Sequence, residues 1–181
     1  MHSVLPSLFN RLLFLACILT SALAAAEFRV GRGKVVITPP IGSVIGNSYG
    51  ITVSTGVSSD VHAKAVVFEL DGVKAALVAC DMISLHAPIV QRTREQIAAR
   101  TGVAPERVML AATHCHAGPQ THPMFFAAAG PAAQQLIERY VEGLPGLIAE
   151  SVRLAEADLR ALFDYQFYLA NIGATYERLG L

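Results

Sequence analysis

Residues 63–81 have the sequence AKAVVFELDGVKAALVACD, in which two apolar, partly β-branched runs flank the pair Asp71-Gly72. Asp-Gly between such runs is a strong indication of a two-residue hairpin turn, so we expect antiparallel strands over residues 63–70 and 74–79. Residues 88–100 begin with a proline and have helical spacing of apolar positions, and residues 107–112 (RVMLAA) are typical of a buried strand. Residues 74–112 therefore predict a βαβ unit.

The βαβ unit predicts where polar side chains meet. The crossover between two parallel strands is almost always right-handed, and the carboxyl ends of both strands open at the same edge of the sheet. Asp81 and His114 follow the two predicted strand ends closely. The predicted fold class is α/β, with a mixed sheet that contains the hairpin and the βαβ unit and is flanked by helices.

Three further segments extend this framework. Residues 28–38 (FRVGRGKVVIT) predict a first strand, ended by two prolines, and residues 41–60, with four glycines, predict a long irregular loop. Residues 131–158 predict helix, which we expect Gly143, Pro145 and Gly146 to kink or divide. Its apolar stripe comprises Leu136, Ile137, Tyr140, Leu144, Leu147, Ile148 and Val152.

Composition bounds the class of protein. The chain has 181 residues, of which 53% are hydrophobic, enough for one modest domain. Because 14 Lys and Arg balance 14 Asp and Glu without a run of like charge, nucleic-acid binding is disfavoured. Residues 163–181 are richer in aromatic residues than the rest of the chain and receive no assignment.

The N-terminus predicts export. Arg11 precedes an apolar run over residues 12–26 that ends in small residues, the layout of a secretory signal peptide. The run is shorter than the roughly 20 residues of a transmembrane helix. We therefore expect residues 1–26 to be removed and the protein to be secreted or periplasmic; a buried N-terminal helix is the alternative.

Export leaves two cysteines in the mature chain, Cys80 and Cys115, because Cys17 lies within the predicted signal peptide. In an oxidising compartment they can form a disulfide. They are equally compatible with isolated thiols, since free cysteine is common in protein cores.

The segment THCHAGP, residues 113–119, contains the residues best suited to chemistry. His114 and His116 directly after a strand can offer imidazoles as zinc ligands or as general acid and base. Asp81 can ligate the metal or accept the second ring N–H of a ligating histidine. The alternatives are loop histidines paired with the backbone, and a carboxylate that caps a helix or a loop. Cys115 as a nucleophile is a weaker hypothesis, because on an extended chain it points away from both histidines.

Three blocks of sequence resemble the neutral/alkaline non-lysosomal ceramidases and their bacterial relatives, in the N-terminal part of the catalytic domain. The blocks are RVGRGKVVITPP (residues 29–40), DVHAKAVV through ALVACD (60–81) and AATHCHAGP (111–119). The last is similar to the family's A-T-H-T-H-S-G-P, with Cys115 and Ala117 in place of the commoner Thr and Ser. The resemblance implies that residues 27–162 form the N-terminal part of such a domain.

The resemblance also implies an activity. Those enzymes are zinc-dependent amidohydrolases that cleave the N-acyl bond of ceramide. His114 matches a zinc ligand of the family and His116 the neighbouring catalytic histidine, with Asp81 as a supporting residue. The implied cofactor is Zn²⁺, and the implied partners are an N-acyl sphingoid lipid or another amide substrate and, at the periphery, a lipid surface.

The remaining family ligands, a His, a Glu and a Tyr, have no counterpart in this sequence. A metal site needs at least three protein ligands, so the resemblance predicts an incomplete catalytic domain that is inactive by itself. The alternative hypothesis is a non-catalytic exported domain that binds lipid or metal weakly.

Overall fold

The computed structural model describes residues 27–46, 50–161 and 176–178. The predicted signal peptide and most of the 163–181 tail lie outside the described residues. In chain order the labelled elements are β1 (Phe28–Val36), β2 (Val44–Ile45), β3 (Thr52–Val53), β4 (His62–Leu70), β5 (Val73–Cys80), α2 (Ala87–Thr101), η1 (Pro105–Arg107), β6 (Val108–Ala112), α3 (Pro123–Phe126), α4 (Pro131–Ala157) and β7 (Arg160–Ala161).

The main sheet has the order β6-β5-β4-β1-β7, and all of its pairs are antiparallel except β5 with β6. The predicted hairpin is confirmed: β4 and β5 are joined at Asp71 (φ +51°) and Gly72 (φ +76°), and positive φ at both positions is what a type I′ turn requires. The predicted βαβ unit is also confirmed, because β5 and β6 are parallel and α2 connects them. The fold is α/β with a mixed sheet.

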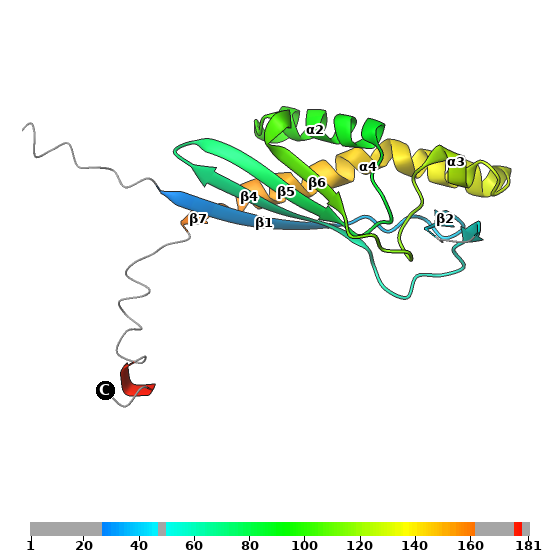
Figure 1. Cartoon of the computed structure of the whole chain (residues 1–181), viewed down its shortest axis with the longest axis horizontal. Helices are drawn as coiled ribbons and strands as arrows, with labels where there is room; N and C mark the ends of the chain where they lie inside the picture. The colour runs from blue at the N-terminus through cyan, green and yellow to red at the C-terminus, as the bar shows by residue number, and fades with distance from the viewer. Residues whose placement is uncertain (1–26, 47–49, 162–175, 179–181) are drawn as a thin grey trace, which may run out of the picture.

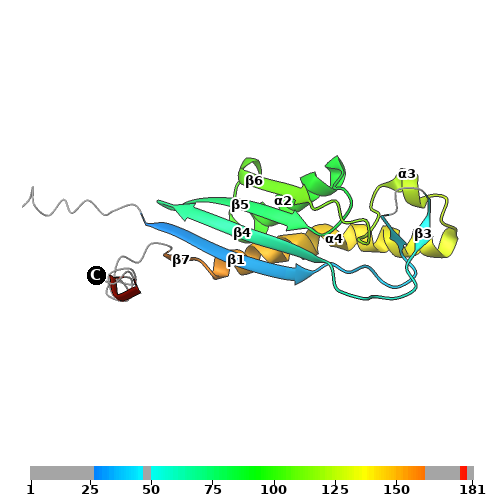
Figure 2. The ribbon, with the colours of Figure 1, turned by 60° about the horizontal axis from the view of Figure 1, so that its bottom comes forward.

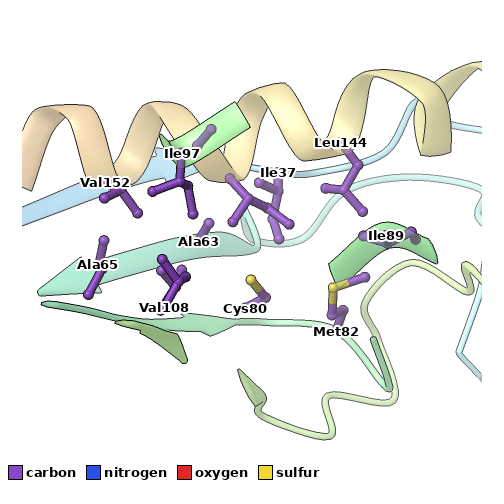
Figure 3. Close-up of a cluster of buried hydrophobic side chains, with 14 of the residues drawn as sticks. Ile37, Ala63, Ala65, Cys80, Met82, Ile89, Ile97, Val108, Leu144 and Val152 are labelled. Atoms are coloured by element: carbon purple, nitrogen blue, oxygen red, sulfur yellow. The ribbon is translucent and has the colours of Figure 1, made fainter. Parts of the chain in front are cut away.

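Both long helices pack on one face of the sheet (Figures 1 and 2). Alternate residues of the central strands supply small and β-branched side chains to that face. Figure 3 shows this core between α4, α2 and the sheet, with Ile97 and Val152 above and Ala65 and Val108 below. The strand residues that are buried in this core are Ala63, Ala65, Val67, Ala76, Val78, Cys80 and Val108.

Helix α4 is one continuous helix of 27 residues with Pro145 in its interior, so the expected division of this segment was wrong. A proline removes one hydrogen bond of the helical ladder. Helix α2 supplies donors to the main chain around this position: Arg92 donates to Glu142 O and Arg100 to Gly146 O, both at 3.0 Å. Leu147 lies outside the buried stripe, with 38% of its surface exposed, although the helical period placed it inside.

The segment predicted as an irregular loop contains a small hairpin, β2 with β3, in which Val44 pairs with Val53. The expectation for residues 41–60 was therefore wrong in part. An isolated bridge between Ile45 and Pro119 connects this hairpin to the segment that contains His114 and His116. Two-residue strands have no detectable periodicity, which is why the sequence did not indicate them.

None of the described helices has the length and apolar character needed to cross a membrane.

Candidate functional site

The parallel pairing of β5 and β6 brings Asp81 and the histidine segment together, as expected from the βαβ unit. Cys80 is in register with Ala112, the Thr113 N–H donates to Cys80 O at 2.9 Å, and the Cys115 N–H donates to Met82 O at 3.1 Å. The segments that follow β5 and β6 therefore continue side by side beyond the sheet. We call residues 113–119 the histidine loop.

The second half of the histidine loop is buried and anchored. Gly118, Pro119 and Gln120 are buried, whereas His114 and His116 are exposed. Gly118 O accepts from the Gly46 N–H at 2.7 Å. A Cβ at Gly118 would lie 2.5 Å from Asp81 O, so only glycine permits the histidine loop to approach the main chain of Asp81 this closely. The loop is thus wedged between the end of β5 and the β2 hairpin.

The conformation of His114 is unusual for a residue other than glycine. Its φ is +61°, in the left-handed region, where strain is often found at functional sites. Its Nδ1 lies 2.9 Å from Ile83 O. A carbonyl only accepts hydrogen bonds, so Nδ1 carries the proton of this bond, and in the neutral ring Nε2 then has the lone pair. This is the arrangement that orients a metal-ligating histidine.

Asp81 makes the contacts of the alternative hypothesis, a loop carboxylate that accepts from the backbone. Its Oδ2 accepts from the His62 N–H and from Lys64 Nζ, both at 3.1 Å, and Oδ1 lies 3.5 Å from the Thr113 hydroxyl. The acceptor for the His114 ring N–H is the carbonyl of Ile83 instead. Sequence reasoning missed Ile83 because a main-chain carbonyl leaves no residue-type signature. Asp81 thus joins the start of β4 to the start of the histidine loop.

The pKa of Asp81 reflects this environment. Partial burial raises the pKa, but the hydrogen bonds from Lys64 and the His62 N–H, with the charges of both side chains, outweigh it and hold the pKa below its ordinary value. A carboxylate with a lowered pKa stabilises the fold above the unfolded-state pKa of about 4. That stabilisation is lost as the pH falls through the folded-state value.

We expect Asp81→Asn to lower the free energy of unfolding at pH 7 by about 1–2 kcal/mol, because charge-assisted hydrogen bonds are lost. The difference from the wild type is expected to shrink as the pH falls below about 4 and to vanish once the pH is below the lowered folded-state pKa, where the wild-type carboxylate is also protonated. Urea denaturation at a series of pH values measures it, with the exposed Glu106→Gln as control. An equal deficit at every pH would contradict an ionic role.

His114 and His116 lie close together with their rings perpendicular and the ring centroids 4.8 Å apart. The two rings thus contact each other on the same exposed loop. Two imidazoles in contact, one with a fixed tautomer, can divide the tasks of ligation and proton transfer.

The other histidines have structural positions. His62 is the first residue of β4. His86 precedes α2 without a side-chain cap, while His122 Nδ1 caps α3 by accepting from the Met124 N–H. Their ring centroids lie 5.6 Å apart. Burial, and then the nearby His122, hold the pKa of His86 below its ordinary value.

Cys80 and Cys115 are both free thiols in the structure, so no disulfide joins them. Cys80 belongs to the core, and burial, followed by the charge of Asp81, raises its pKa to about 12. This thiol is therefore unreactive. Cys115 and Ala117 line a cavity of about 560 Å³ beside the histidine loop, whose other walls include Ile45, Val53, Ser54, Val57 and Ser59.

The described residues do not complete a metal site. Nowhere among them do three His, Cys, Asp or Glu side chains come together in a way that could hold a metal ion. His114 has the chemistry of a single ligand, but zinc in proteins takes at least three. Any complete zinc site that includes His114 therefore requires donors from outside the described residues.

Comparison with solved structures shows similarity to neutral ceramidases. The neutral ceramidase from Pseudomonas aeruginosa is 25% identical, with a TM-score of 0.62 over 75% of this chain. A ceramidase complexed with C2 gives 24% identity and a TM-score of 0.61 over the same share. This chain spans only 22% of either structure, so it corresponds to part of a ceramidase fold. No family model matches the sequence, and no match is found among curated proteins.

Proposed function

We propose that this chain is the ceramidase-like part of an amide hydrolase acting on N-acyl sphingoid lipids, in which His114 is one zinc ligand and His116 transfers protons. The observation that carries the proposal is the His114 Nδ1 to Ile83 O hydrogen bond of 2.9 Å, which leaves Nε2 as the ligating atom. The similarity to neutral ceramidases supports the proposed substrate class.

The strain at His114 supports the same assignment. A left-handed φ at a residue with a side chain costs free energy, and the structure maintains it by burying the following residues, Gly118 to Gln120. The exposed end of the loop is thereby held rigid by its buried end. A ligand whose ring is fixed in advance binds metal more tightly than one that must be ordered.

His116 is the proton-transfer group of the proposal. It is exposed, and its ring contacts that of His114 edge to face. Imidazole titrates near neutral pH, and amide hydrolysis needs a proton delivered to the leaving nitrogen.

The zinc assignment predicts which atom of His114 binds the metal. We expect titration of the purified full chain with Zn²⁺ to perturb the Nε2 signal of His114 in ¹⁵N-detected histidine spectra, with Nδ1 protonated throughout. Because the described donor set is incomplete, we expect weak, saturable binding. His114→Ala should abolish the effect, while His122→Ala, which changes a histidine with a capping role, should leave it intact.

A zinc response spread equally over all histidines, or one that survives in His114→Ala, would contradict the assignment. The same samples can be assayed for fatty acid release from an N-acyl sphingosine. If the chain turns over substrate, His116→Ala is expected to lower kcat by about 10²-fold or more, as for the loss of a general acid or base.

A second candidate function is favoured by the lack of three clustered metal donors among the described residues. It is a non-catalytic exported domain that binds lipid or metal weakly. Folded protein that binds an N-acyl lipid, shows no zinc response at His114 and releases no fatty acid would establish it in place of the hydrolase.

A further inference from the structure

We propose that the end of the molecule that carries the histidine loop docks onto an electrically neutral lipid surface through an apolar rim. The inference rests on the proposed function, since it describes how the site would reach a lipid substrate. The rim consists of large apolar side chains that are exposed on short elements and loops: Ile41, Ile51, Val53, Val57, Met124 and Phe125.

The rim residues come from separate segments that meet at one end of the fold. Figures 1 and 2 place β2, β3 and α3 together at the end opposite to β7. Ile51, Met124 and Phe125 line one cavity of about 240 Å³, so the β3 hairpin and α3 face each other. The exposed fractions of Met124 and Phe125 are 68% and 51%. These side chains lie on protruding elements, which suits insertion into a soft surface.

Three segments of sequence at this end of the molecule lack ionic charge. Residues 35–59, 82–91 and 108–137 contain no Asp, Glu, Lys or Arg, although such residues make up 15% of the whole sequence. These segments include the histidine loop itself, the β2 hairpin, α3 and the residues that lead into α2. Charged side chains are costly to bring against lipid, so their exclusion from three converging segments favours a lipid-facing end over a water-facing one.

The lack of charge also selects the kind of lipid. Attraction to anionic membranes depends on clustered Lys and Arg, and these three segments contain neither. Docking through this end must therefore depend on burial of apolar side chains. The partner that fits is a zwitterionic or uncharged lipid surface, and binding should be insensitive to salt.

The rim is continuous with the site. Val53 and Val57 of the rim and Cys115 and Ala117 of the histidine loop line the same cavity of about 560 Å³. Hydroxyl-bearing residues, among them Ser54 and Ser59, line this cavity as well. A lipid that left the surface at the rim would meet both apolar and hydroxyl groups. This arrangement suits an amphipathic molecule with a polar head.

The test is binding of the full chain to phosphatidylcholine vesicles that contain no N-acyl sphingoid lipid, measured by flotation without added zinc. We expect the wild type to float with the vesicles and Met124→Ser/Phe125→Ser to reduce the partition coefficient about tenfold or more. The matched control is Met109→Ser, because Met109 is as exposed, at 62%, but lies on β6, outside the rim. Circular dichroism verifies that each variant is folded.

Salt and lipid charge complete the test. Raising the salt from about 0.05 M to about 0.5 M, or adding phosphatidylserine, should change partitioning by less than about twofold. Binding that requires phosphatidylserine, an equal loss in Met109→Ser, or failure of the folded wild type to float would overturn the proposal. Rim-dependent self-association in place of flotation would also overturn it, in favour of a second copy as the occupant. Because zinc and amide lipid are absent, this result is independent of the zinc response at His114.

Discussion

Gly31→Ala is expected to destabilise the fold severely. In β1, Gly31 faces α4, and a Cβ at this position would lie 1.9 Å from Ala155 O, well inside contact distance. The obstructing atom belongs to the main chain of a helix, so no side-chain rotation relieves the clash. Gly33 is in the same situation, with a Cβ 2.0 Å from Ser151 O. Strand and helix therefore pack backbone against backbone.

We expect Gly31→Ala to cost more than about 3 kcal/mol of unfolding free energy, a large part of the about 5–15 kcal/mol that stabilises a typical domain. Urea denaturation followed by circular dichroism measures this cost. Gly56→Ala is the matched control, because nothing lies within 4 Å of a Cβ at Gly56. A Gly31→Ala protein as stable as this control would show that α4 does not pack against β1 as described.

The second large effect is expected for Gly118→Ala. A Cβ there would lie 2.5 Å from Asp81 O and 2.9 Å from Met82 Cα, so the histidine loop must move away from the end of β5. That movement breaks the hydrogen bond from the Cys115 N–H to Met82 O and displaces His114 from Ile83. We expect an unfolding cost of about 1–3 kcal/mol, as for overpacking of a close contact.

The distinguishing measurement for Gly118→Ala is the tautomer of His114. Histidine ¹⁵N spectra of the wild type should show Nδ1 protonated, and the variant should show the mixture typical of a free imidazole. Gly50→Ala serves as control, since a Cβ at Gly50 has open space around it. A variant that is folded and keeps the wild-type tautomer would contradict the role given to Gly118.

The local sequence pattern was sufficient to predict the longer helices and strands. The Asp71-Gly72 turn, the strands on either side of it and α2 were predictable because each depends on residues close in sequence. Hydrophobic period was a poorer guide within α4, where Leu147 has the spacing of a buried residue but is 38% exposed. The interior proline was misread because its neighbouring carbonyls accept from α2, which the segment's own sequence does not reveal.

The sequence by itself determined the α/β class, the βαβ order and the placement of Asp81 and the histidine loop at one edge of the sheet, since strand ends follow from short-range pattern and a chiral rule. Only the tertiary structure decided that Ile83 O accepts a hydrogen bond from His114 and that Asp81 accepts from Lys64 and the His62 N–H. It also decided that the main chain of α4 packs directly against Gly31. These are contacts between main-chain atoms or residues distant in sequence. Their energies depend on the positions of whole elements, and no local pattern of residues encodes those positions.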